Sequence, residues 1–420
     1  MEKNTKEEQS SGKPNYTSMI PADKYDHRLP HEVAAIILMA AYDVVVKKLA
    51  WERETGKLYL LAIVCALLSG ELRAQTNADS LVKKGKLTLE GYVDVYYSYS
   101  TNHPKDGERP YFVSYNRDNE INVNLAYISL KYTADRVRAS FTPGFGTYMN
   151  ANYASERQTL QNLLEASVGV RIFKNKDIWL DAGVIGSPYT NESAYSFDQL
   201  PYTRSLGSEN VPYYLTGARL TLPLSEKWTA YLFLLNGWQV IQAQHDPLDF
   251  GSQLEFKPSS QWDINWNTYI GNESSVTNPN YKTRYFTDLY ASYNPSAAWS
   301  FTADGYVGWQ KRYEDGDLRA RRWWNGNVCA RYTFVPGNSF SARIEHFDDP
   351  YALLVTPETN VSGFRLTGAS VGYNLAVSDE VLFRLESRYF GSPEELYALR
   401  NQTNTNKDLW LTAGLTARFR

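Results

Sequence analysis

From Lys86 to the C-terminus, apolar and polar residues alternate with a period of two. In residues 299–310, for example, Trp299, Phe301 and Val307 belong to the apolar set, and Asp304 belongs to the polar set. Alternation of this kind gives a β-strand one apolar face and one polar face. Each alternating segment extends over about 10 residues or more, which is the length that a tilted strand needs to cross the hydrocarbon layer of a membrane.

Sixteen such segments follow one another, and the connections between them are alternately short and long. The short connections fall at residues 134–135, 174–176, 224–226, 258–260, 295–297, 335–338 and 376–379. The long connections fall at residues 101–119, 149–162, 187–210, 240–248, 274–280, 313–320, 349–362 and 392–406. Outer-membrane barrels have an even number of antiparallel strands, short periplasmic turns and long external loops. We therefore predict an all-β fold, a transmembrane antiparallel up-and-down β-barrel of about 16 strands over residues 86–420, with both termini in the periplasm.

Two other fold classes fit the sequence poorly. A soluble sandwich of this length would need a core larger than single domains sustain, and the mean hydropathy of −0.46 argues against a bundle of membrane helices. In a closed barrel only alternate residues meet lipid, because every backbone group pairs with a neighbouring strand. Aromatic residues make up 14% of the chain and gather at strand ends, as expected for girdles at the two membrane surfaces.

The first 85 residues do not share the alternating pattern. Residues 51–74 are predicted to be a signal peptide, because the apolar run 58–70 follows four basic residues and a cleavage site after Ala74 would leave Gln75 first. Ser69 and Gly70 are alternative end points. Residues 75–85 would then form a short periplasmic lead. Residues 1–50 are expected to be absent from the mature protein because the start codon is assigned too early; a genuine cytoplasmic extension is the alternative.

Charge and cysteine content exclude some functions. The 43 basic and 46 acidic residues nearly balance, so the chain has no footprint for nucleic acid. Only Cys329 remains after signal cleavage, which excludes an internal disulfide. The histidines of the mature chain are scattered, so we predict no metal and no cofactor.

An outer-membrane barrel enzyme is the rival functional class. His346 is predicted on the lipid-facing side near the end of its strand, with Asp348 and Asp349 after it. The sequence contains neither G-x-S-x-G nor H-E-x-x-H. We therefore expect no catalytic activity and interpret His346 as a residue of the membrane interface.

Three short runs resemble one known family. They are Trp179–Gly183 (WLDAG), Pro201–Ser205 (PYTRS) and Pro212–Gly217 (PYYLTG). Together they are similar to the OmpL-like putative β-barrel porin family of Bacteroidetes, and the similarity extends from about Leu87 to the C-terminus. The resemblance implies an outer-membrane porin and supplies no catalytic residues. The residues that carry the family motif are Trp179, Asp181, Thr203, Arg204, Ser205, Pro212, Tyr213 and Tyr214.

The C-terminus departs from such barrels. They usually end on an aromatic residue that the assembly machinery recognises, whereas here Phe419 is followed by Arg420. The departure concerns the efficiency of assembly and leaves the predicted fold unchanged.

The third long loop, residues 187–210, is the longest and mixes aromatic with charged residues. Such a loop can pack on itself or against the inner wall of a barrel. On the polar faces, arginines concentrate late in the chain and acids occur on earlier strands. The basic wall of a pore constriction is predicted from Arg331, Arg343, Arg365, Arg384 and Arg388, with Asp198 and Glu209 of the third loop as its acidic side. Ordinary polar lining is the alternative, because Glu345 and Glu386 lie among the arginines.

These observations predict a porin in the outer membrane of a Gram-negative bacterium. It would be a passive diffusion channel for small hydrophilic solutes or ions, in which opposed charges create a transverse field. Its partners would be outer-membrane lipid, those solutes, the barrel-assembly machinery and, in a homo-trimer, further copies of itself. A barrel with a plugged lumen, whose external loops bind a partner or a surface polymer, is the alternative.

Overall fold

A computed structural model describes residues 85–401 and 403–420. The predicted extension at residues 1–50, the signal peptide at 51–74 and nearly all of the periplasmic lead lie outside the described residues.

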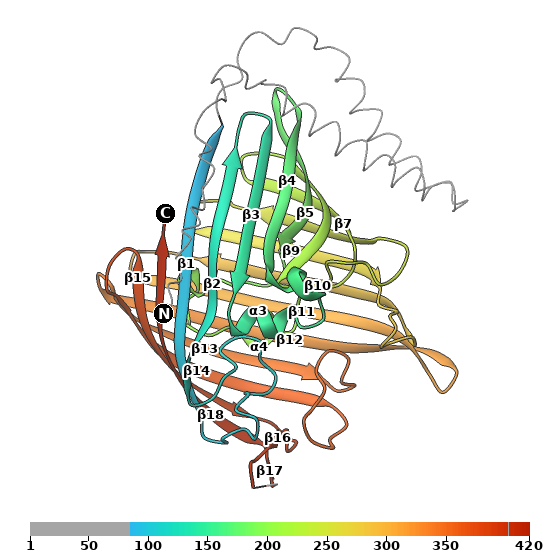
Figure 1. The fold of residues 1–420 in the computed structure, drawn as a ribbon, viewed down its shortest axis with the longest axis vertical. Coiled ribbons are helices and arrows are strands. Elements are labelled where there is room, and N and C mark those ends of the chain that lie inside the picture. The colour runs from blue at the N-terminus through green and yellow to red at the C-terminus, as the bar shows by residue number, and fades with distance from the viewer. Residues whose placement is uncertain (1–84, 402) are drawn as a thin grey trace, which may run out of the picture. The chain divides into compact units, whose positions relative to one another are not determined.

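Sixteen antiparallel strands form a closed barrel, which confirms the predicted fold class (Figure 1). Each strand pairs with its neighbours in sequence, and β1 closes the ring by pairing with β18. The barrel strands are β1 (Lys86–Ser100), β2 (Glu120–Thr133), β3 (Val137–Phe145), β4 (Leu163–Phe173), β5 (Lys176–Gly186), β6 (Tyr214–Pro223), β7 (Trp228–Leu235), β8 (Asp249–Phe256), β9 (Trp262–Asn272), β10 (Tyr281–Tyr293), β11 (Trp299–Glu314), β12 (Asp317–Val335), β13 (Asn338–Asp349), β14 (Phe364–Ala376), β15 (Val381–Gly391) and β18 (Lys407–Phe419).

The remaining elements are short and belong to the loops. They are α3 (Thr147–Asn152), η1 (Gln158–Asn162), η2 (Ser196–Asp198), α4 (Leu206–Glu209) and a two-stranded sheet of β16 (Tyr397–Ala398) and β17 (Asn404–Thr405). Within the described part of the chain, no helix has both the length and the apolar character needed to cross a membrane.

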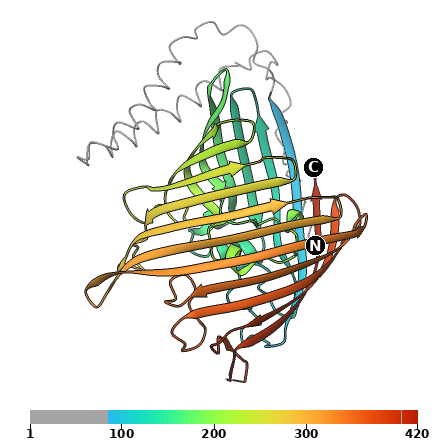
Figure 2. The ribbon, with the colours of Figure 1, turned by 180° about the vertical axis from the view of Figure 1, so that it is seen from behind.

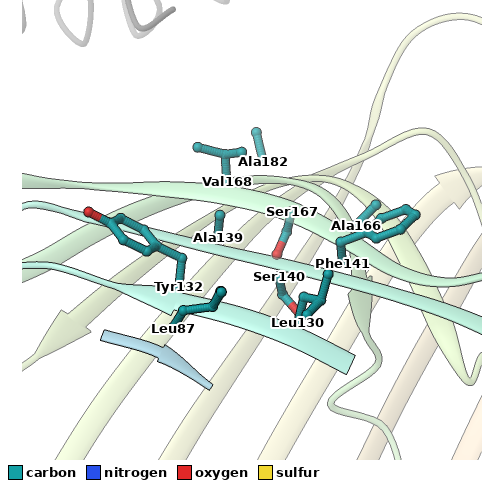
Figure 3. A pocket seen from close by; sticks show the side chains of 10 residues that line it. All are labelled: Leu87, Leu130, Tyr132, Ala139, Ser140, Phe141, Ala166, Ser167, Val168 and Ala182. Atoms are coloured by element: carbon teal, nitrogen blue, oxygen red, sulfur yellow. The ribbon is translucent and has the colours of Figure 1, made fainter. Parts of the chain in front are cut away.

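The outward face of the barrel is apolar, as a membrane-spanning barrel requires. The side chains of Leu289, Val328 and Ile344 point outward and are 55%, 57% and 70% exposed. A shallow groove of about 440 Å³ lies on the outward face, across β1 to β5 (Figure 3). Its lining includes the exposed side chains of Leu130 and Phe141, which suits contact with lipid.

The seven short turns occur where the sequence predicts them, but one long loop does not. Residues 313–320 were expected to form a loop, whereas β11 and β12 continue their pairing to Glu314 and Asp317. Only Asp315 and Gly316 connect them, both with positive φ (52° and 87°), as in the two-residue turns typical of Asp-Gly hairpins. The hairpin extends the two longest strands beyond the adjoining ones (Figure 2).

The main hydrophobic core lies inside the barrel, near the ends of the strands that carry the long loops. Inward-facing side chains such as Trp323 and Trp410 pack there against residues of four loops, among them Phe112, Leu353 and Leu396. This interior packing explains why the predicted position of Arg365 was wrong. Since Phe364 and Leu366 turn inward to join the core, Arg365 between them points outward, where it pairs with Asp348 at 2.9 Å.

Candidate functional site: a third loop bound to an arginine wall

The third loop, residues 187–213, leaves β5, enters the barrel and returns to β6 (Figure 1). Its short helix α4 contacts β12 and β13, which lie far round the ring from β5 and β6. Gly207 permits this approach, because a Cβ atom there would lie 2.3 Å from the side-chain amide of Asn325 on β12. The loop therefore crosses the lumen.

Four arginines on the inner wall receive the loop. Arg331 on β12, Arg343 on β13, and Arg384 and Arg388 on β15 all point inward, and we refer to these four residues as the arginine wall. The sequence predicts all four as basic lining residues. In the structure the last three are each only 1% exposed, because the loop covers them.

Arg343 makes the most contacts with the loop. Its guanidinium donates to the Thr203 carbonyl at 2.6 Å and to the Thr203 hydroxyl at 3.0 Å. On its other edges it pairs with Glu386 at 2.9 Å, Glu345 at 3.3 Å and the loop residue Glu192 at 3.4 Å. Charge-assisted hydrogen bonds of this kind are roughly twice as strong as neutral ones.

Two glutamates that lie among the arginines of the wall bind the loop backbone directly. Glu386 accepts a hydrogen bond from the Thr203 amide at 2.6 Å, and Glu345 accepts one from the Leu206 amide at 2.6 Å. Arg388 joins them, since it pairs with Glu345 at 2.6 Å and donates to the Arg204 carbonyl at 2.8 Å. The arginines of the wall and the two glutamates between them thus bind one segment of the loop, residues 203–206.

The other two arginines bind backbone carbonyls of the loop. Arg384 donates to the Phe197 carbonyl at 2.9 Å, and Arg331 donates to the Leu200 carbonyl at 2.9 Å and to the Gln199 carbonyl. The arginine wall is therefore a binding surface for the loop, and its charges face protein rather than an open pore.

The two acids predicted to face this wall take other partners. Asp198 pairs with Arg418 of β18 at 2.7 Å, next to the wall. Glu209 does not reach the wall: it accepts a hydrogen bond from the Val113 amide at 2.7 Å and lies 3.7 Å from Arg204. Burial raises the pKa of the Glu209 carboxyl, and the charge of Arg204 opposes this shift.

The family motif holds the loop in shape. Arg204 is fully buried between the rings of Tyr148 and Tyr213, at 4.5 and 4.8 Å from their centroids. The hydroxyl of Tyr214 donates to Glu156 of the second loop at 2.7 Å. Ser205 caps α4 by accepting a hydrogen bond from the Ser208 amide.

The first part of the motif lies elsewhere, on β5. Asp181 pairs there with Arg138 and with Arg219, and the Arg138 guanidinium lies 4.4 Å from the Trp179 ring centroid. These residues tie β5 to β3 and β6 on the inner wall and do not touch the arginine wall.

Sequence reasoning missed Asp94 of β1, which forms the second anchor of the loop. Its carboxylate accepts hydrogen bonds from the hydroxyls of Tyr202 at 2.8 Å, Tyr115 at 2.9 Å and Ser196 at 3.1 Å. Tyr202 and Ser196 belong to the third loop and Tyr115 to the first. An acid alternating with apolar residues identifies Asp94 as inward-facing, but nothing in the sequence indicates its partners.

Glu192 was missed for a similar reason. It accepts a hydrogen bond from the Ser205 amide at 2.6 Å and pairs with Arg343, so it links two parts of the loop to the wall. Its only signal in the sequence is that it is an acid within the third loop.

Comparisons with known proteins agree with this architecture. The sequence matches the family described as putative beta-barrel porin-2, OmpL-like, over residues 86–419. None of the curated proteins is significantly similar to the chain in sequence.

Several solved porins share the fold. Salmonella typhi OmpF in complex with daunomycin is 12% identical, with a TM-score of 0.54 over 80% of this chain and 98% of that chain. The trimer form of Vibrio cholerae OmpT is 8% identical, with a TM-score of 0.53 over 80% of this chain and 100% of that chain. The anion-selective porin of Comamonas acidovorans is 12% identical, with a TM-score of 0.52 over 80% of this chain and 100% of that chain. Because the family match covers the barrel from β1 to β18, the chain belongs to the putative beta-barrel porin-2, OmpL-like family of outer-membrane proteins.

Proposed function

We propose that the protein is an outer-membrane diffusion channel of narrow bore, which admits ions and small hydrophilic solutes. The observation that carries this proposal is the third loop, which crosses the lumen and is bound along residues 203–206 to the arginine wall. A loop fixed across the lumen restricts the cross-section that a solute can use. Pore diameter and the charges that line it then decide which solutes pass.

Charged side chains on the inner wall nearer the short turns support a water-filled vestibule there. Arg138, Arg219 and Asp263 point inward, and their side chains are 34%, 28% and 40% exposed. Charged groups that keep this much exposure in a membrane-spanning barrel need water beside them. We assign the short turns and both termini to the periplasmic side, so that the vestibule opens toward the periplasm.

Planar-bilayer recording tests the proposal. The purified barrel should give discrete conductance steps, with a reversal potential that shifts in a salt gradient. Liposome swelling with sugars of increasing size should show a low size limit. A folded barrel that conducts no ions would contradict a channel.

A plugged barrel is the second candidate, because the loops are joined to one another. The hydroxyl of Tyr111 in the first loop accepts a hydrogen bond from the Glu358 amide of the seventh loop at 3.0 Å and donates to the Leu396 carbonyl of the eighth. In addition, Glu156 of the second loop accepts a hydrogen bond from the Ile241 amide of the fourth at 2.8 Å. If the folded barrel does not conduct, these joined loops would instead offer a rigid surface to a partner or surface polymer.

The assembly state is a further part of the proposal. A homo-trimer is supported by the trimer form of the Vibrio cholerae OmpT structure, which shares the fold. Cross-linking in native membranes, followed by electrophoresis without heating, distinguishes a trimer from a monomer.

A further inference from the structure

Two buried carboxylates of the inner wall lack a positive partner. Asp288 on β10 and Asp304 on β11 are 1% and 5% exposed. Among the described residues, no lysine, arginine or histidine comes within salt-bridge distance of either carboxylate. Burying an ionised carboxylate without a counter-charge is costly, so such a group usually binds a cation or a proton.

The hydrogen bonds to these two acids leave one oxygen of each without a donor. Asp288 accepts the Thr190 amide, at 2.7 Å on Oδ2, and interacts with the Asn267 side chain, and Asp304 accepts the side-chain amides of Asn325 and Asn327, both on Oδ2. The Oδ1 atoms of Asp288 and Asp304 are buried and unbonded.

Other buried acids of the same barrel are saturated with donors. Asp94 accepts from five side chains, and Asp349 accepts from three consecutive backbone amides at 2.8 to 3.2 Å. A carboxylate oxygen without a hydrogen-bond donor is therefore a feature of Asp288 and Asp304 and not of the buried acids here in general.

Strand register places the two acids next to each other on the inner face. Asp288 lies opposite Tyr306, and Asp304 lies opposite Tyr290, so the acids form a diagonal pair across β10 and β11. Diagonal neighbours are roughly 7–8 Å apart at the backbone, close enough for both carboxylates to reach one ion between them. Asn267 faces Asp288 from β9, is fully buried, and its side-chain amide interacts with the Asp288 carboxyl.

The third loop places a side-chain amide next to the partners of this pair. Asn191 follows Thr190, the residue whose amide binds Asp288, and donates to the Thr302 hydroxyl at 2.8 Å and to Asn327 at 3.2 Å. Its own carbonyl oxygen is buried and unbonded. The loop thus offers one further oxygen ligand.

We propose that Asp288, Asp304 and Asn191 bind a calcium ion between the third loop and the β10–β11 wall. Carboxylates and amide oxygens are the ligands that Ca²⁺ prefers, and water completes its shell of six to eight. Mg²⁺ demands a stricter octahedron, and the softer metals favour nitrogen or sulfur ligands. In the described residues no three His, Cys, Asp or Glu side chains come together as a metal site, so a calcium ion here would have two carboxylates as its charged ligands and would take the rest of its shell from amide oxygens and water.

The ion would neutralise the two acids and fasten the loop on the side away from the arginine wall. This inference is independent of conduction, because the loop could be fastened in an open or a plugged barrel.

Thermal unfolding of the purified barrel after EDTA treatment tests the proposal. Added CaCl₂ should raise the unfolding temperature saturably, with one ion bound per chain by equilibrium dialysis, and MgCl₂ should have a smaller effect. Asp288→Asn and Asp304→Asn should abolish the calcium response. Asp263→Asn is the matched control, because that acid lies on β9, is 40% exposed and has Lys257 at 3.5 Å.

Asn191→Ala keeps the test decisive if the strand variants do not fold. It removes only the ligand from the loop and should weaken calcium affinity by about 10-fold or more. The proposal is overturned if the native barrel binds no calcium at a saturable site, or if Asp288→Asn, Asp304→Asn and Asn191→Ala all respond to calcium as the native barrel does. It is also overturned if acidification stabilises the native barrel and calcium does not, because the acids would then hold protons.

Discussion

Replacing Arg343 with alanine should release the third loop from the arginine wall. The guanidinium is fully buried and contacts Thr203 twice and three glutamates once each. Arg343→Ala would leave Glu192, Glu345 and Glu386 with one cation fewer. Removing one partner of a buried ion pair typically costs about 3–5 kcal/mol.

That free energy can be expressed as a change in the equilibrium between the docked and the undocked loop. Since about 1.4 kcal/mol corresponds to tenfold in an equilibrium constant, the loop-docking constant should fall between about 100-fold and about 4,000-fold. The undocked loop would then be populated often enough to appear as larger, noisier conductance steps in planar bilayers. It should also become accessible to protease in intact outer membranes.

Arg365→Ala is the matched control for this experiment. Arg365 is an arginine of the neighbouring strand β14, but it points outward, its side chain is 46% exposed and its partner is Asp348. An exposed pair contributes about 0–1 kcal/mol, so neither conductance nor protease sensitivity should change. Equal effects of the two substitutions, or native conductance and protease resistance in a folded Arg343→Ala barrel, would refute the role of Arg343.

Three further predictions concern the outward face, the first loop and helix α4. Ile344→Arg, at mid-strand on the outward face, should destabilise the folded barrel by about 2–4 kcal/mol in urea titration, whereas Leu87→Arg, near a strand end, should cost about 0–1 kcal/mol. Because burial raises the pKa of Glu209 in the docked loop, although the Val113 amide opposes this shift, docking of the third loop on the first should be most stable below the usual pKa of glutamate. It should weaken as pH rises from there to the raised value, and hydrogen-exchange protection of the Val113 amide measures this. Gly207→Val should displace α4 from β12 by overpacking and cost about 1–3 kcal/mol, seen as a lower unfolding temperature.

The barrel itself could be predicted from the sequence because its signal is repeated on every strand. Alternation with a period of two fixes the faces wherever one side meets lipid and the other meets polar groups. Residues 299–310 show this: Ala303 and Gly305 point outward, and Asp304 and Tyr306 point inward. Arg331, Arg343, Arg384 and Arg388 were therefore placed on the inner face from sequence alone.

The same rule failed where the interior is apolar. Near the loop ends of the strands, Phe364 and Leu366 pack into the lumen, so hydrophobicity no longer identifies the lipid side and Arg365 was assigned to the wrong face. The prediction of a long sixth loop was wrong for a local reason. The Asp315-Gly316 pair closes a tight hairpin, and the charged residues around it resemble those of a solvent-exposed loop.

Partners of individual loop residues could not be predicted either. Glu209 binds the backbone amide of Val113 in the first loop, and the two residues are 96 positions apart in the sequence. Contacts between irregular segments have no period, so the composition of the third loop indicates that it folds inward but not which of its acids meets which arginine.

The position of Asp94 has a consequence for how the barrel closes. This residue lies on β1, and besides the third loop it accepts a hydrogen bond at 3.1 Å from Thr416 of β18, the strand that pairs with β1 to complete the ring. First strand, last strand and loop therefore share one carboxylate. Closure of the seam and insertion of the loop stabilise each other, so a nascent barrel that seals with the third loop outside would lack part of what holds its seam together.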